Sequence, residues 1–344
     1  MEEQRIASSE EKINYVSEMI RKDPKNQDLY LKMATLSLDQ DNIAEAEAAL
    51  STYENLKGSG PEADFLKARI NYELGRNQTA LEIAENLFLN GFEAIELHEL
   101  LYHLYLEADE VLKAIDQINY AIEKNPANHE YFFFKAVCYM ENRDTVNAIV
   151  SLETAINDGY RSMEAIVQYV DILVAHDDRE KAAETINLGI SIDALNPDLN
   201  TAYARLLKNQ DQFRKAKDIL FGILSEDSDH YKALAALSEV YLDTYSYDSA
   251  LFYSTRAIQL NENFFPPYFV KADVFERRKN HYSALDIYSQ VLERDPDNPV
   301  ALHEYERIRS YLSYNQRLSQ QLDSTRQAIR NLPKPVKKTI YNGQ

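Results

Sequence analysis

A single alanine recurs along this chain at a fixed interval, and it constrains the fold more than any other feature. Each occurrence lies 34 residues after the previous one, without an insertion: Ala46, Ala80, Ala114, Ala148, Ala182, Ala216, Ala250 and Ala284. Self-similarity at such a period is the signature of stacked supersecondary units, each of which buries its apolar face against the next. The sequence therefore predicts an array of repeats over residues 27–298.

The residues between these alanines favour helices. Apolar side chains recur three and four residues apart, as in Ile115, Ile118 and Ile122, which gives a helix one buried stripe. Gly and Pro number only 8 and 10 in 344 residues, and Pro126 and Pro296 stand where a repeat would end. We expect an all-α protein, with an alanine wherever two helix axes approach closely.

The period and the small residues resemble those of tetratricopeptide repeats, in which two helices per repeat cross at small side chains. The repeats would run 27–60, 61–94, 95–128, 129–162, 163–196, 197–230, 231–264 and 265–298. The small site of the first helix is kept less strictly, as Ala34, Ala68, Tyr102, Ala136, Val170, Ala204, Ser238 and Ala272. The resemblance implies a right-handed α-solenoid of about eight helical hairpins, and such solenoids bind other proteins.

Both ends of the chain are interpreted as caps. Residues 1–26 would hold a capping helix with Ile13, Val16 and Ile20 on one face. Residues 299–331 would form a long C-terminal capping helix whose later half is polar, and residues 332–344 would form a disordered basic tail. These two C-terminal segments carry a local charge of +5, which makes self-association through the helix and tail one possible role.

Charge and composition argue against nucleic acid as a partner and against a membrane-spanning segment. The net charge of −19 repels nucleic acid, and no segment has the roughly 18 apolar residues of a membrane span. The single cysteine, Cys138, lies in an apolar run and is interpreted as a buried thiol. No signal peptide follows Met1, which favours the cytoplasm. A periplasmic lipoprotein whose signal segment has been removed remains the alternative.

The resemblance also implies which residues face the concave side: the second, fifth, ninth, twelfth and thirteenth of each repeat. The second column is acidic in six successive repeats, and the thirteenth is acidic in the first four. An acid in the first turn of a helix is explained by the helix dipole alone, but an acid at the helix C-terminus is not. The fifth and twelfth columns are apolar in most of the early repeats, where the side chains would either bind a ligand or pack between neighbouring helices.

We therefore expect a protein or peptide partner of basic or amphipathic character in an acidic, partly apolar groove over repeats two to five. The candidate binding residues are Glu62, Phe65, Tyr72, Glu73, Glu96, Leu106, Glu107, Glu130, Phe133, Met140, Glu141 and Glu164. The later repeats interrupt the pattern with Thr201, Lys208, Ala235 and Glu276.

Catalytic chemistry is not indicated. His98 and His103 resemble a zinc-protease pair, but they are five residues apart rather than four and so lie on different faces of a helix. We expect no catalytic residue, no metal and no cofactor. The predicted function is a non-catalytic interaction scaffold or adaptor. The alternatives are a self-associating scaffold and a structural subunit of a larger assembly, for which a bacterial envelope complex is one option.

Overall fold

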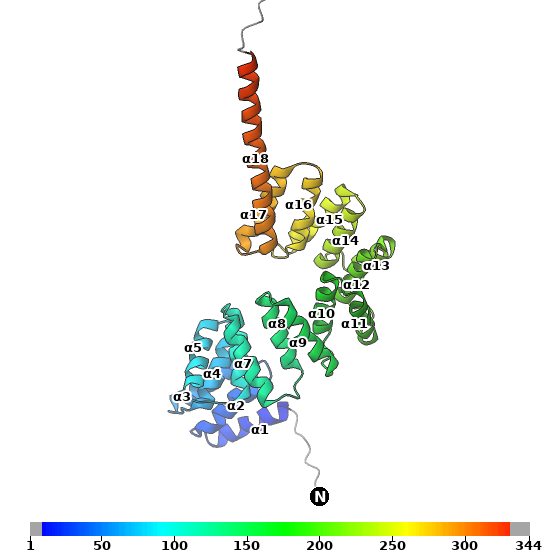
Figure 1. Cartoon of the computed structure of the whole chain (residues 1–344). Coiled ribbons are helices and arrows are strands. Elements are labelled where there is room, and N and C mark those ends of the chain that lie inside the picture. The colour runs from blue at the N-terminus through cyan, green and yellow to red at the C-terminus, as the bar shows by residue number, and fades with distance from the viewer. Residues whose placement is uncertain (1–8, 331–344) are drawn as a thin grey trace, which may run out of the picture. The chain divides into compact units, whose positions relative to one another are not determined.

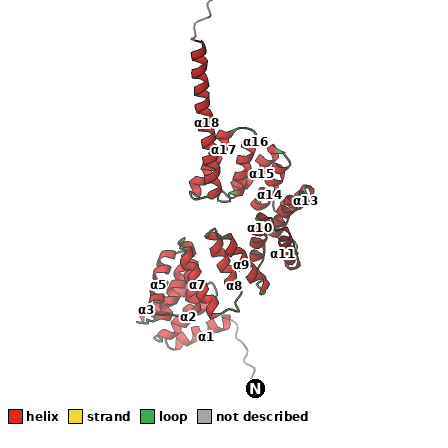
Figure 2. Ribbon diagram, in the orientation of Figure 1, coloured by secondary structure: helices red, strands yellow, loops and turns green. Residues whose placement is uncertain are grey.

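A computed structural model describes residues 9–330 of the chain. Over these residues the secondary structure consists of 18 α-helices joined by short turns, with no strand (Figure 2). The expected all-α class is confirmed. The chain divides between Ala165 and Ile166 into two compact units, within helix α10, and each unit is described by itself.

The helices alternate as first and second members of hairpins that stack on one another within each unit (Figure 1). The first helices are α2 (Gln27–Leu38), α4 (Pro61–Glu73), α6 (Ile95–Glu107), α8 (Glu130–Glu141), α10 (Met163–Ala175), α12 (Pro197–Asn209), α14 (Tyr231–Asp243) and α16 (Pro266–Arg277). The second helices are α3 (Ile43–Asn55), α5 (Asn77–Leu89), α7 (Val111–Lys124), α9 (Thr145–Asn157), α11 (Arg179–Ile192), α13 (Phe213–Glu226), α15 (Tyr247–Leu260) and α17 (His281–Arg294).

The recurring alanines lie where the two helices of a hairpin meet. All eight are fully buried, from Ala46 to Ala284. The small site of the first helix is equally buried, and even its largest member, Tyr102, is only 2% exposed. A methyl group lets two backbones approach closely, and this explains why the period survives while the surface residues vary.

The turn inside each hairpin repeats as strictly as the alanines do. One residue per turn has a positive φ between 57° and 70°: Asp41, Gly75, Asp109, Arg143, Asp177, Asp211, Tyr245 and Lys279. The amide of the next residue donates to the carbonyl of the residue five positions earlier, as from Asn42 to Ser37 at 2.8 Å. This is the Schellman arrangement that ends a helix, and it sends the chain directly into the second helix.

The two terminal helices cover the ends of the units. Helix α1 (Ser9–Lys22) buries Val16 against the first hairpin. Helix α18 (Pro299–Arg330) packs on α17 through Ala301 and Ile308, which are 0% and 1% exposed. The predicted basic tail at 332–344 lies outside the described residues.

Candidate functional site

In the N-terminal unit, the two acidic columns occupy opposite ends of the first helices. Glu62, Glu96 and Glu130 lie in the first turns of α4, α6 and α8. Their position matches the helix dipole, which accounts for them without a ligand. The thirteenth column is different: Glu73, Glu107 and Glu141 are the last residues of α4, α6 and α8 and are all exposed.

No Lys or Arg forms an ion pair with Glu73, Glu107 or Glu141 among the residues that the structure describes. A carboxylate at the negative end of a helix costs free energy, on the order of 0.3–1 kcal/mol at an exposed position. Three such acids on neighbouring first helices therefore weaken the fold slightly. They need an explanation other than stability.

A row of rings lies beside these acids and crosses three first helices. Tyr72 of α4 stacks on His103 of α6, with their ring centres 6.1 Å apart. The ring centre of His103 lies 5.6 Å from that of Phe134 of α8. Tyr102 stacks on the same phenylalanine ring, with the ring centres 5.0 Å apart. Because Tyr102 stands where most repeats have a small residue, its ring reaches the next helix.

The acids act electrostatically on this row. Burial raises the pKa of Tyr72, and the charges of Glu107 and Glu73 raise it further. Burial lowers the pKa of His103, while Glu107 and Glu130 oppose that effect. Burial also raises the pKa of Tyr102, with smaller contributions from the charges of Glu164 and Glu141. We call this set the acidic aromatic face: Tyr72, Glu73, His103, Glu107, Glu130, Phe134, Glu141 and Glu164. Tyr102 is buried behind it, with only 2% of its side chain exposed.

The other predicted residues are placed less favourably for contact with a ligand. Phe133 is only 5% exposed and packs against Tyr160, whose hydroxyl donates to Glu130 at 3.1 Å. Phe65 and Leu106 are half-buried and pack against the apolar core of the unit. Met140 is also half-buried, whereas Glu62 and Glu96 are exposed.

The C-terminal unit carries a charged ladder that the sequence analysis missed. Asp171, Arg205 and Glu239 occupy the ninth position of successive repeats. Arg205 lies 3.3 Å from Asp171 and 3.5 Å from Glu239, and Lys208 lies 2.9 Å from Glu239. Burial would raise the pKa of Glu239, but the positive charges of Arg205 and Lys208 outweigh it, so the net direction is downward.

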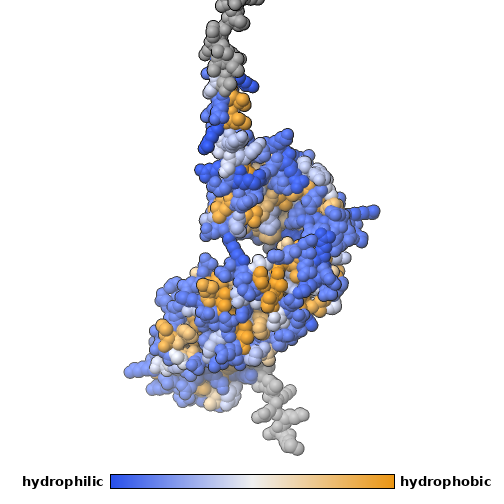
Figure 3. Space-filling view, in the orientation of Figure 1, coloured by the Kyte–Doolittle hydropathy of each residue, from blue (hydrophilic) through white to orange (hydrophobic). Residues whose placement is uncertain are grey.

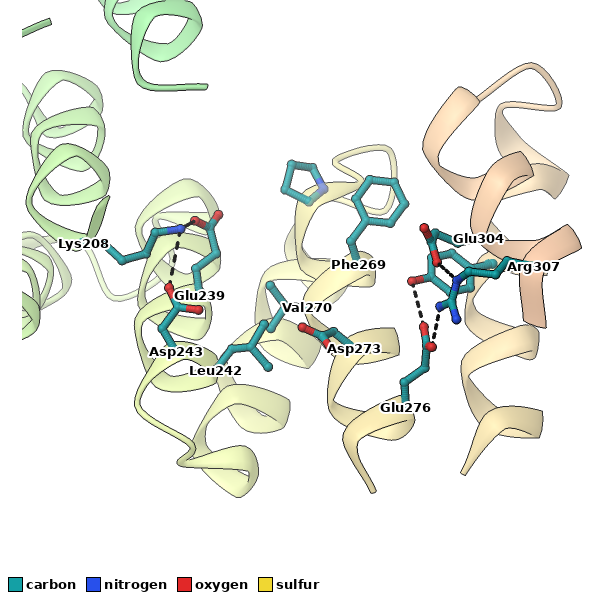
Figure 4. A pocket seen from close by; sticks show the side chains of 12 residues that line it. Lys208, Glu239, Leu242, Asp243, Phe269, Val270, Asp273, Glu276, Glu304 and Arg307 are labelled. Carbon is teal, nitrogen blue, oxygen red and sulfur yellow. Dashed lines mark hydrogen bonds and ion pairs between the residues drawn. The ribbon is translucent and has the colours of Figure 1, made fainter. Parts of the chain in front are cut away.

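The ladder ends at a cleft of about 540 Å³ formed by α12, α14, α16, α17 and α18. Figure 4 shows an apolar strip of Leu242, Val270 and Phe269 between two ionic groups. One group joins Lys208 to Glu239 and Asp243, and the other joins Arg307 of α18 to Glu276 and Glu304. We call this the C-terminal cleft.

Acids outnumber bases in the lining of the C-terminal cleft, but each acid has a basic partner. Five carboxylates and two cations line it, and Asp273 is held by Arg277 through two bonds of 3.0 Å. The ninth column would have revealed the ladder, because an acid, a base and an acid follow one another at the repeat interval in Asp171, Arg205 and Glu239. The same column continues with Asp273. The fifth and twelfth columns hold Phe269 and Leu242 of the same cleft.

His98 and Cys138 are both packed in the interior of the N-terminal unit. His98 is 3% exposed, its Nδ1 lies 2.8 Å from Gln117 Oε1, and its ring stacks on Tyr120 at 3.8 Å. Cys138 is fully buried, as expected, and burial raises the pKa of its thiol to about 12. Within residues 9–330 there is no group of three side chains suited to a metal ion. In the same range no helix combines the length and the apolar character needed to cross a membrane.

Comparison with known proteins agrees with this architecture. A family model described as a tetratricopeptide repeat matches residues 31–89. A search of curated proteins found no matching sequence. Among solved structures, a tetratricopeptide repeat protein from Parabacteroides merdae aligns with a TM-score of 0.56 at 16% identity, covering 72% of this chain and 98% of that one.

Two further structures align over more of this chain. The APC/C hetero-tetramer Cut9–Hcn1 gives a TM-score of 0.54 at 16% identity, covering 86% of this chain and 58% of that one. Yeast Tom70 gives a TM-score of 0.51 at 13% identity, covering 89% of this chain and 78% of that one. The 34-residue period, the helical hairpins and the family match at residues 31–89 together show a tetratricopeptide-repeat architecture.

Proposed function

We propose that the protein is a non-catalytic adaptor that binds a basic or amphipathic peptide segment on the acidic aromatic face of its N-terminal unit. The observation that supports this most strongly is the set of unpaired acids Glu73, Glu107 and Glu141 at three helix C-termini. A bound lysine or arginine would supply the missing positive charge. The rings of Tyr72 and His103 offer the apolar and cation–π contacts that such a side chain favours.

The C-terminal cleft is the weaker candidate for the same ligand. Its acids are already paired with Lys208, Arg277 and Arg307, so a basic peptide would have to break existing ion pairs there. Binding at Glu73, Glu107 and Glu141 requires no such exchange. The predicted residues on the acidic aromatic face are Tyr72, Glu73, Glu107, Glu130, Glu141 and Glu164. Phe65 and Leu106 pack against the apolar core of the same unit.

The test uses a fluorescent amphipathic dodecapeptide of Lys and Leu as the probe, and a Glu/Leu peptide of the same length as the negative probe. Binding is measured by fluorescence anisotropy with the full chain. Glu107→Lys combined with Glu141→Lys should lower the affinity for the Lys/Leu probe by about tenfold or more, which corresponds to about 1.4 kcal/mol of binding free energy. Raising the salt concentration from about 50 to about 300 mM should also weaken binding, because the charges are exposed.

The matched control is Glu82→Lys combined with Glu123→Lys. These two acids lie on the second helices α5 and α7 of the same unit and are exposed. The control changes the net charge by the same amount, so it should keep most of the affinity. Equal affinity of the two double variants would mean that the probe senses only the overall charge, and the proposal would then be wrong.

A second readout separates a binding role from a structural one. Glu107→Gln and Glu141→Gln each remove a carboxylate from the negative end of a helix, so each should leave the free energy of unfolding equal or slightly higher. A loss of stability would show that these acids serve the fold.

A further inference from the structure

Helix α18 is too long to be only a cap. It has 32 residues, which corresponds to a length of about 48 Å. Its first half is anchored on α17 by Ala301, Ile308 and the half-buried Leu312. After Asn315, every side chain that the structure describes is exposed. The second half of the helix therefore extends beyond the hairpins without support from them.

The extended half carries an apolar stripe. Leu318 and Leu322 are 41% and 50% exposed, and Figure 3 shows apolar side chains on this part of the helix. The sequence spaces Asn315, Leu318, Leu322, Thr325 and Ile329 at intervals of three, four, three and four residues. That is the heptad spacing of a coiled-coil seam, with Asn315, Leu322 and Ile329 at the a positions and Leu318 and Thr325 at the d positions.

A partner would stabilise this segment as a helix, because the hairpins do not cover it. An isolated helix of about 15 residues is marginal in water even when it is rich in alanine, and this one is rich in Ser and Gln. Burying the leucines against another helix would supply the apolar contacts that the hairpins do not make with this segment.

We propose that the segment from Asn315 to Ile329 pairs with the same segment of a second copy as a parallel, in-register, two-stranded coiled coil. Asn315 supports this choice of partner, because a single asparagine at an a position pairs with its own equivalent and specifies register and dimeric state.

The flanking positions are compatible with self-pairing. In a parallel pair, the g residue of one helix faces the following e residue of the other. Here Tyr314 would face Ser319, and Gln321 would face Arg326. No pair of like charges is brought together. Two heptads make a short seam, so dimerisation should be weak and dependent on concentration.

Sedimentation velocity of the full chain from about 1 to about 200 μM tests the pairing. The wild-type protein should shift from monomer to dimer across this range. Leu318→Glu combined with Leu322→Glu should remain monomeric, with the dissociation constant raised at least about tenfold. Both leucines are exposed, so the hairpins should fold normally, and circular dichroism with thermal unfolding checks that they do.

The matched control is Gln316→Glu combined with Gln320→Glu, which adds the same two negative charges on exposed residues outside the stripe. It should dimerise like the wild type. A wild-type monomer at every concentration would overturn the proposal and leave a different protein as the partner of this helix. A dimer that survives in the Leu318/Leu322 variant would place the contact elsewhere and overturn it as well.

The orientation has its own test. Cys138 is the single cysteine and is fully buried, so the background for oxidation is low. Thr325→Cys places a thiol in the seam, where a parallel in-register pair brings two thiols together and a disulfide-linked dimer forms under mild oxidant. Gln320→Cys is the control and should crosslink much more slowly. An antiparallel pair would separate the two introduced thiols, so failure of the Thr325→Cys variant to crosslink despite dimerisation would overturn the parallel arrangement.

Discussion

Arg205 and Glu239 lie 3.5 Å apart on neighbouring first helices of the C-terminal unit, and each side chain is only 18% exposed. They occupy the same position of successive repeats. Asp171 holds Arg205 from the other side at 3.3 Å, and Lys208 shares Glu239 at 2.9 Å. Because the helices α10, α12 and α14 are joined by charge at this level, the stacking of these repeats depends on an ion ladder with a largely buried centre as well as on apolar packing.

Replacing Arg205 by Met should destabilise the C-terminal unit. The change leaves Asp171, which is 40% exposed, without its ion-pair partner. It also leaves Glu239, which is only 18% exposed, with Lys208 alone. Removing one member of a buried pair costs about 3–5 kcal/mol, and the residual exposure here reduces the expected loss to about 2–3 kcal/mol. Urea unfolding followed by circular dichroism measures this loss.

Arg278→Met is the matched control for Arg205→Met. Arg278 pairs with Asp248, whose side chain is 95% exposed, so the loss should be below about 0.5 kcal/mol. If the two substitutions cost the same, the ladder contributes no more than a surface ion pair does.

The hairpin turns make a second prediction. Lys279 has φ 58° and is exposed, whereas Gly75 occupies the same turn position with φ 70°. A side chain with a Cβ costs roughly 1 kcal/mol in this left-handed region. Lys279→Gly should therefore raise the free energy of unfolding by up to about 1 kcal/mol, and Gly75→Ala should lower it by a similar amount. Urea midpoints of both variants check the opposite signs, and a shift in the same direction would contradict the account.

The fold is largely predictable from the sequence because the recurring alanines mark the positions where two helix backbones approach closely. Wherever Ala46 and its equivalents recur, two helices must cross, and the hairpin order follows from this requirement. The turns are also visible in the sequence, since position 15 of the repeat favours Asp or Gly, as at Asp41 and Gly75.

The candidate site is less predictable, because side-chain partners depend on neighbours in the next repeat. The column pattern places Phe133 on the binding face, but the ring of Tyr160 covers it. The pairing of Arg205 with Glu239 emerges only when the ninth column is compared across repeats. Tyr102 departs from the small residues of the family pattern, yet its ring joins α6 to Phe134 of α8.

The acidic aromatic face should make stability depend on pH near neutrality. Burial holds the pKa of His103 below its ordinary value of 6.5, so the unfolded chain takes up a proton at a higher pH than the folded chain does. The free energy of unfolding should therefore decrease as the pH falls below about 6.5, and should level off below the folded-state pKa. Urea unfolding at pH values of about 7.5 and about 5.5 measures the decrease.

His103→Gln is the comparison that assigns this effect. The variant keeps a polar side chain but cannot titrate, so its loss of stability between the two pH values should be smaller than that of the wild type. Some loss should remain, because burial lowers the pKa of His98 in the same direction. An identical loss in wild type and variant would show that His103 does not titrate differently in the folded chain.

Two glycines in second helices of the C-terminal unit should respond to alanine with opposite signs. A Cβ at Gly189 would lie 2.7 Å from Cδ2 of Leu199, a fully buried side chain, so Gly189→Ala overpacks the contact between helices α11 and α12. Overpacking costs about 1–3 kcal/mol, which exceeds the gain of about 1 kcal/mol in helix propensity. At Gly222 of α13 a Cβ would meet nothing within 4 Å, so Gly222→Ala should instead stabilise by about 0.5–1 kcal/mol. Urea unfolding of the two variants decides the matter: if Gly189→Ala is as stable as Gly222→Ala, the small residue at the crossing of these helices is not required for their approach.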